Sequence, residues 1–60
     1  MYRKPEDVTE ALLSGKAKLR SMRNLVSNYR TAGRVDVVIM LMSGIEMYLW
    51  ETKYKVEVEE

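Results

Sequence analysis

Basic side chains recur through the first half of the chain at a spacing that could bind anions. They follow a four-three rhythm, in which Ser27 takes one place: Lys16, Arg20, Arg23, Arg30 and Arg34. We call these five residues the basic stripe. On one continuous helix they would share an edge, and no acid interrupts them. The basic stripe therefore predicts contact with an acidic surface, which a protein or a nucleic-acid backbone could supply.

The simplest interpretation of the basic stripe is a solvated helix face, partly paired with Glu46, Glu51 and Glu57 of a neighbouring helix. An acidic protein partner is the next interpretation. Nucleic acid ranks last, because no aromatic residues interleave with the basic ones and a two-helix hairpin lacks the third helix of the usual helix-turn-helix domain.

A second group combines residues suited to protein recognition: Ile39, Met40, Met47 and Trp50. We call it the Met–Trp cluster. Methionine adapts its shape to a partner, and tryptophan is a frequent anchor in interfaces. The cluster could dock a regulatory or host protein. The interpretation that the sequence favours is burial of the same residues in a core built by two copies.

Catalytic chemistry has little basis in these residues. The chain contains no His and no Cys, so it lacks the usual acid-base relay, thiol nucleophile and zinc ligands. Asp36 and Glu46 would lie roughly 15 Å apart on one helix, and the three glycines are isolated rather than gathered in a phosphate loop. We therefore expect no enzyme, no cofactor and no metal site.

The elements that would carry these groups are two helices, over about 5–31 and about 35–53. Pro5 before two acids is typical of a first helical turn. An apolar seam then recurs in steps of four and three: Val8, Leu12, Gly15, Leu19, Met22, Val26, Tyr29 and Gly33. Gly15 leaves two alternatives open, close approach of another backbone or a break in the helix at Ser14–Gly15.

The second helix would follow a turn closed by Gly33 in a left-handed conformation, with Asp36 at its start. At 100° per residue one broad face is apolar: Val37, Val38, Leu41, Met42, Ile45, Tyr48, Leu49, Thr52 and Val56. The alternative is a helix packed on a C-terminal β-hairpin that turns at Ser43–Gly44. Residues 52–58 alternate with period two, as in a short strand or a frayed helix end before a charged tail.

Size and charge complete the predicted architecture. A 60-residue chain that is 47% hydrophobic buries only about 60% of its unfolded surface, and the 35–50 run is too apolar for one hairpin to cover. Residues 1–34 are basic and residues 35–60 acidic, which favours an antiparallel fold and pairing of copies. The sequence thus predicts a single all-α domain over 1–60, a two-helix antiparallel hairpin that dimerises into a four-helix bundle.

Function and location are predicted in the same way. We expect a non-enzymatic protein-protein interaction module, a small regulator or inhibitor, with a nucleic-acid-binding accessory factor as the alternative. Its partners would be a second copy and another protein. The 35–50 run is shorter than the roughly 20 residues of a membrane span and contains Asp36, and no apolar stretch follows the N-terminal basic pair as in a signal peptide. The expected location is cytoplasmic.

Two weak resemblances accompany this prediction. A hairpin with Tyr29, Gly33 and Ser43 resembles the small sporulation-phosphorelay aspartyl-phosphate phosphatases, whose second helix carries Ser-Gln-Glu-Leu-Asp. Here the stretch from Ser43 reads Ser-Gly-Ile-Glu-Met, so only the serine agrees. The pattern of Asn28–Tyr29, Gly33, Val35–Asp36, Leu41 and Ile45–Glu46 is also similar to helical hairpins in small phage-encoded regulators.

Overall fold

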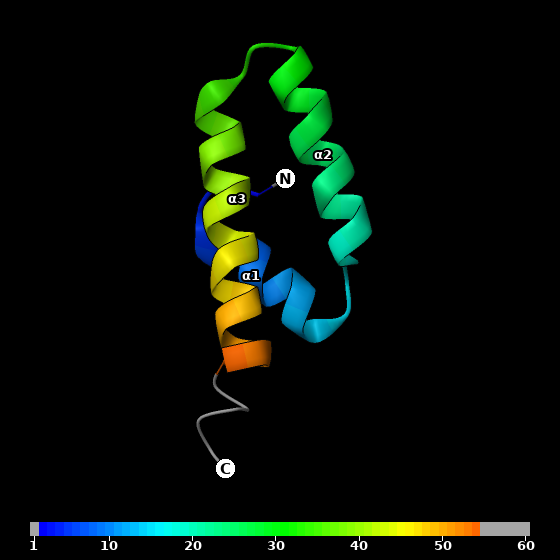
Figure 1. Cartoon of the computed structure of the whole chain (residues 1–60), viewed down its shortest axis with the longest axis vertical. Coiled ribbons are helices and arrows are strands. Elements are labelled where there is room, and N and C mark those ends of the chain that lie inside the picture. The colour runs from blue at the N-terminus through cyan, green and yellow to red at the C-terminus, as the bar shows by residue number, and fades with distance from the viewer. Residues whose placement is uncertain (1, 55–60) are drawn as a thin grey trace.

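Three α-helices form in the part of the chain that the structure describes, and the first two pack on the third (Figure 1). The computed structural model describes residues 2–54, in which the elements are α1 (Pro5–Ser14), α2 (Leu19–Thr31), α3 (Val35–Leu49) and a π-helical turn, η1 (Trp50–Tyr54). No strand occurs in this part of the chain. The all-helical class is therefore confirmed, but the expectation of two helices is not, since the structure has three.

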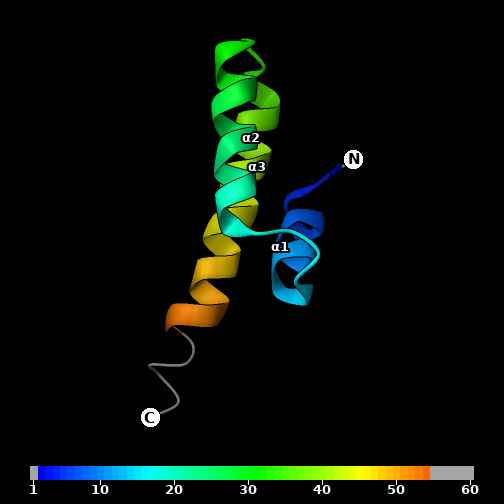
Figure 2. The ribbon, with the colours of Figure 1, turned by 90° about the vertical axis from the view of Figure 1, so that its right-hand side faces the viewer.

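Both α1 and α2 pack on α3, at different places along it. Figure 1 shows α2 antiparallel to α3 and beside its first half, while α1 lies against the half nearer η1. Figure 2 shows α1 set to one side of the α2–α3 pair. The long helix α3 is therefore the element that both other helices pack on, and each shorter helix covers part of its apolar face.

The prediction of one continuous helix over 5–31 is wrong, because the chain breaks at Gly15. Gly15 adopts φ 84°, a left-handed conformation that costs a residue with a Cβ roughly 1–2 kcal/mol. Its N–H donates to the Leu12 carbonyl at 3.3 Å, and the Ala17 N–H donates to the Ala11 carbonyl at 3.1 Å. Of the two alternatives for Gly15, the structure shows the break, and it redirects the chain so that the two halves of the seam meet different parts of α3.

The turn between α2 and α3 is the one that Gly33 predicts. Gly33 has φ 79°, and its N–H donates to the Arg30 carbonyl at 3.1 Å while the Arg34 N–H donates to the Tyr29 carbonyl at 2.9 Å. This pair of hydrogen bonds is the Schellman arrangement that satisfies the last carbonyls of a helix. The left-handed position of Gly33 is therefore confirmed.

The β-hairpin alternative for the second half is wrong, because Val35–Leu49 is one continuous α-helix. Asp36 lies in its first turn without capping it through the side chain, and pairs with Arg34 at 3.6 Å. Residues 52–54 continue the helical path in η1. The rest of the predicted strand or charged tail lies outside the described residues.

The core forms where the three helices meet. Its buried members come from every helix: Val8, Ala11, Leu12, Met22, Leu41 and Ile45. The predicted apolar face of α3 is confirmed at Val38, Leu41 and Ile45, which are all buried, but Met42 is 46% exposed. Both α1 and α2 pack on α3, and the edge of its apolar face at Met42 is exposed to solvent.

The helices α3 and α1 approach each other closely at Gly44. A Cβ at this position would collide with the Val8 side chain and lie 2.7 Å from the Pro5 carbonyl oxygen. The Thr9 hydroxyl lies beside the same contact, 2.9 Å from the Gly44 carbonyl oxygen and 3.2 Å from that of Pro5. The close backbone approach that the sequence considered for Gly15 therefore occurs at Gly44.

We expect Thr9→Val to lower the free energy of unfolding by about 1 kcal/mol, because a half-buried hydroxyl that donates to a backbone carbonyl is replaced by a methyl group of similar size. Urea denaturation monitored by far-ultraviolet circular dichroism measures the change. Thr31→Val is the matched control, since the Thr31 hydroxyl bonds to its own helix at an exposed position and should matter less. Equal effects of the two substitutions would contradict the role assigned to Thr9.

Candidate interaction surfaces

The fold divides the basic stripe into three parts. Arg20, Arg23 and Arg30 remain together on α2, where all three side chains are exposed. They lie outside the face of α2 that packs on the core through Met22. We call these three arginines the α2 basic face.

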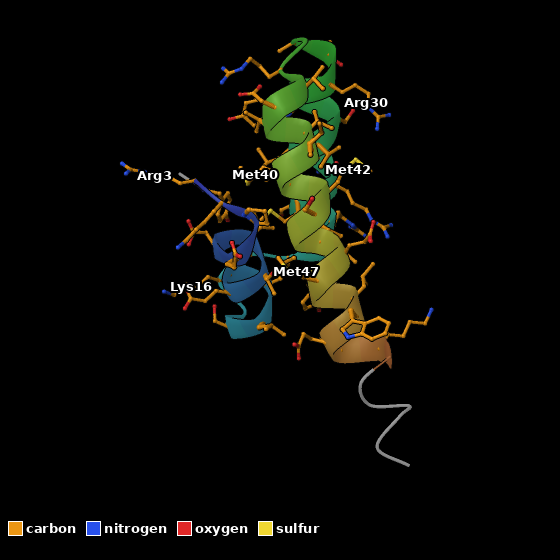
Figure 3. The ribbon with its side chains drawn as sticks, turned by 90° about the vertical axis from the view of Figure 1, so that its left-hand side faces the viewer. Arg3, Lys16, Arg30, Met40, Met42 and Met47 are labelled. Atoms are coloured by element: carbon orange, nitrogen blue, oxygen red, sulfur yellow. The ribbon has the colours of Figure 1, made fainter. Side chains whose placement is uncertain are left out.

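The other two members of the basic stripe lie elsewhere. Lys16 falls in the connection after the break at Gly15 and lines a small hollow with Tyr2, Asp7 and Glu10. Arg34 lies in the turn before α3 and pairs with Asp36. In Figure 3, Lys16 lies beside α1, whereas Arg30 lies on the other side of α3. The single straight edge expected from the spacing required an unbroken helix, and so it does not form.

The Met–Trp cluster also separates. Ile39 and Trp50 are 60% and 61% exposed, but they lie eleven residues apart on the helical path, about 16 Å by its rise. Met40 is half-buried against the core, and Met47 is half-buried in a groove beside α1. The four residues of the Met–Trp cluster therefore do not form one patch.

A different apolar row is exposed on α3 instead. Val35, Ile39 and Met42 are 64%, 60% and 46% exposed, and their spacing of four and three residues places them on one side of the helix. We call these residues the α3 stripe. It runs for about 10 Å, seven residues at the rise of an α-helix, on the side of α3 that neither α1 nor α2 covers.

Beyond the α3 stripe, a groove opens between α1 and the last turns of α3. It has a volume of about 1200 Å³. Its apolar lining comes from both walls: Leu13, Met47, Leu49 and Trp50. Four acids and one base also line it: Glu6, Glu10, Glu46, Glu51 and Lys53. We call this the α1–α3 groove, and it is larger than the hollow beside Lys16.

The sequence prediction included only Met47 and Trp50 among the residues of this groove. Glu6, Glu10 and Leu13 recur in steps of four and three on α1, which is a signal that they share a face. What the spacing could not indicate is that this face of α1 lies next to Trp50. That proximity depends on how α1 crosses α3 at Gly44.

The described residues were also searched for a metal-binding group and for a helix that could span a membrane. Within residues 2–54, no three His, Cys, Asp or Glu side chains are grouped so that they could hold a metal ion. None of the helices in this range combines the length and the apolar character that crossing a membrane requires.

The fold and these surfaces define a small three-helix protein with an exposed apolar row, an acidic groove and a basic helix face. Comparison with protein-family models, with curated proteins and with solved structures found no match.

Proposed function

We propose that the protein is a non-enzymatic protein-binding module, a small regulator that acts by docking on another protein through the uncovered side of α3. The observation that supports this proposal is the exposure of large apolar side chains along the central helix, from the α3 stripe to Trp50. The α3 stripe is an exposed apolar row, and Trp50 is a further exposed apolar side chain on the same helical path. Exposed apolar surface is typical of protein interaction sites. The adjoining α1–α3 groove extends that surface.

The test is capture of a partner from an extract of the source cell, with the wild-type chain and an Ile39→Asp/Trp50→Asp variant. Both positions are exposed, so the fold should persist and is checked by circular dichroism. The control is Ser21→Asp/Asn28→Asp, which adds the same charge at exposed positions of α2. We expect saturable binding of one protein by the wild type and the control, and its loss in the first variant. Absence of a saturable protein, or its undiminished capture by the α3 variant, would contradict the proposal.

We also propose that copies associate through the α3 stripe. A stripe of about 10 Å is too short for the roughly 800 Å² per partner that stable interfaces bury, so the association should be weak and depend on concentration. A pair would contain six helices, not the four expected from a two-helix hairpin. Sedimentation at increasing concentration measures it, and a strict monomer at millimolar concentration would refute it.

A second candidate function is nucleic-acid binding through the α2 basic face. The supporting observation is that Arg20, Arg23 and Arg30 are exposed on one helix without an intervening acid. Three phosphate contacts predict an affinity for duplex DNA that falls with salt at a logarithmic slope of about −2.7. Replacing the three arginines with Ala should abolish this binding. Lack of binding to duplex DNA and to single-stranded RNA at low salt would exclude it.

A further inference from the structure

We infer that the α1–α3 groove is a binding site for a basic amphipathic helix of a partner protein. The inference rests on the proposed function, since it names the chemistry of the segment that a protein-binding module would receive.

The walls of the groove are the faces of two packed helices. On α1, the lining residues Glu6, Glu10 and Leu13 follow steps of four and three, and on α3 and η1, Ser43, Met47 and Trp50 do the same. Each wall is therefore one helical face about two turns long. A groove between two such faces suits a third helix, which packs its ridge of side chains along both walls. The occupant that fits is helical and about three turns long.

The lining provides places for apolar anchors. Leu13 is 52% exposed and Trp50 is 61% exposed, one on each wall, and Met47 lines the same wall as Trp50, three residues before it. Methionine adapts its shape to the apolar side chains of a partner. Tryptophan is enriched among the residues that contribute most to the affinity of interfaces. The occupant therefore presents apolar residues at intervals of three and four along one side.

The charge of the groove lining indicates which residues should flank the apolar side chains of the occupant. Four carboxylates line the groove, Glu6 and Glu10 from α1 and Glu46 and Glu51 from the opposite wall, and Lys53 is the one base among the lining residues within 2–54. An approaching acidic helix would be repelled, whereas Lys or Arg beside the apolar anchors would face carboxylates on both walls. Charge complementarity thus favours a basic amphipathic helix over a neutral or acidic one.

A second copy of this chain is a poorer occupant. The α2 basic face has the required charge, but its exposed neighbours, Ser27 and Asn24, are polar and provide no apolar anchor. The α3 stripe has the apolar residues, but the acid Asp36 lies next to it. Neither described surface combines basic charge with apolar anchors, so the matching helix belongs to another protein.

The test uses three synthetic 14-residue peptides that lack tryptophan. The first has Leu at helical intervals of three and four with Lys at the other positions. The second replaces every Lys with Glu, and the third has the composition of the first in an order without helical periodicity. Trp50 is the only tryptophan in the chain and lines the groove, so a blue shift of its emission reports occupancy directly, and calorimetry gives the affinity.

We expect the Lys peptide to bind and shift the Trp50 emission, with the Glu peptide and the aperiodic peptide at least about tenfold weaker. A Glu10→Gln/Glu46→Gln variant should bind the Lys peptide about tenfold more weakly than the wild type. Ser21→Lys/Asn28→Lys changes the net charge equally, but at exposed positions of α2, and should bind almost as the wild type does.

Several outcomes would overturn the inference without touching the proposed function. Preference for the Glu peptide, equal affinity for the aperiodic peptide, or equal weakening by both double variants would refute the assigned chemistry. A Trp50 shift on concentrating the protein without peptide would show a second copy in the groove. If none of the three peptides binds, the groove is not a helix site, and partner capture separately decides whether the chain binds proteins.

Discussion

We expect Gly44→Ala to destabilise the protein, although alanine is a better helix former than glycine. In an exposed helix interior, this substitution would stabilise the fold by up to about 1 kcal/mol. At Gly44 the new Cβ would collide with Val8 and lie 2.7 Å from the Pro5 carbonyl oxygen. Because Pro5 contributes backbone to the contact, side-chain adjustment is insufficient and α1 must move away from α3.

We expect a loss of about 2–3 kcal/mol in the free energy of unfolding, at the upper end of overpacking costs. For a chain of 60 residues, a loss of this size is a large fraction of the total stability. Urea denaturation monitored by circular dichroism measures it. Ser43→Ala is the matched control, because it adds helix propensity at the adjacent, exposed position. A Gly44→Ala variant as stable as the wild type would contradict the close crossing of α1 and α3.

Leu41→Ala is expected to have the largest effect of any single truncation in α3. Leu41 is 1% exposed in the core that all three helices share, and truncation of such a leucine costs about 2–5 kcal/mol from lost burial and the remaining cavity. A chain of this size is expected to be partly or wholly unfolded by that loss. Loss of helical signal and of a cooperative thermal transition would show it.

Ile39→Ala is the control for this experiment. Ile39 lies two residues earlier on the same helix and is 60% exposed, so its truncation should change the stability of the monomer by less than about 0.5 kcal/mol. The two variants should be compared at low and at high protein concentration. A cost at Ile39 that appears only at high concentration would support association through the α3 stripe. Equal costs at low concentration would mean that the buried side of α3 is assigned incorrectly.

Helix ends were predictable because they depend on local chemistry. Pro5 followed by two acids marked the start of α1, and Gly33 marked the end of α2, where its left-handed conformation completes a Schellman turn. The division at Gly15 was one of two alternatives. A seam of apolar residues continues across Gly15 in the sequence, so periodicity alone could not show whether one helix or two carried it.

The candidate site was less predictable, because it depends on which helices meet. The basic stripe assumed a straight helix, so Lys16 was grouped with arginines from which the break at Gly15 separates it. The Met–Trp cluster grouped residues by type along α3. The structure instead brings Leu13 from α1 into the same groove as Trp50. The spacing of residues within either helix could not predict that these two side chains line one groove.

The sequence by itself favoured an all-helical protein, and it indicated where α2 ends and that α3 is too apolar to be covered completely. These properties follow from residue type and periodicity over a few turns. Only the tertiary structure decided which residues of α3 remain exposed and which acids surround the groove. The physical reason lies in the crossing at Gly44: a residue without a side chain lets α1 approach α3 closely, and that approach fixes what lies next to Trp50.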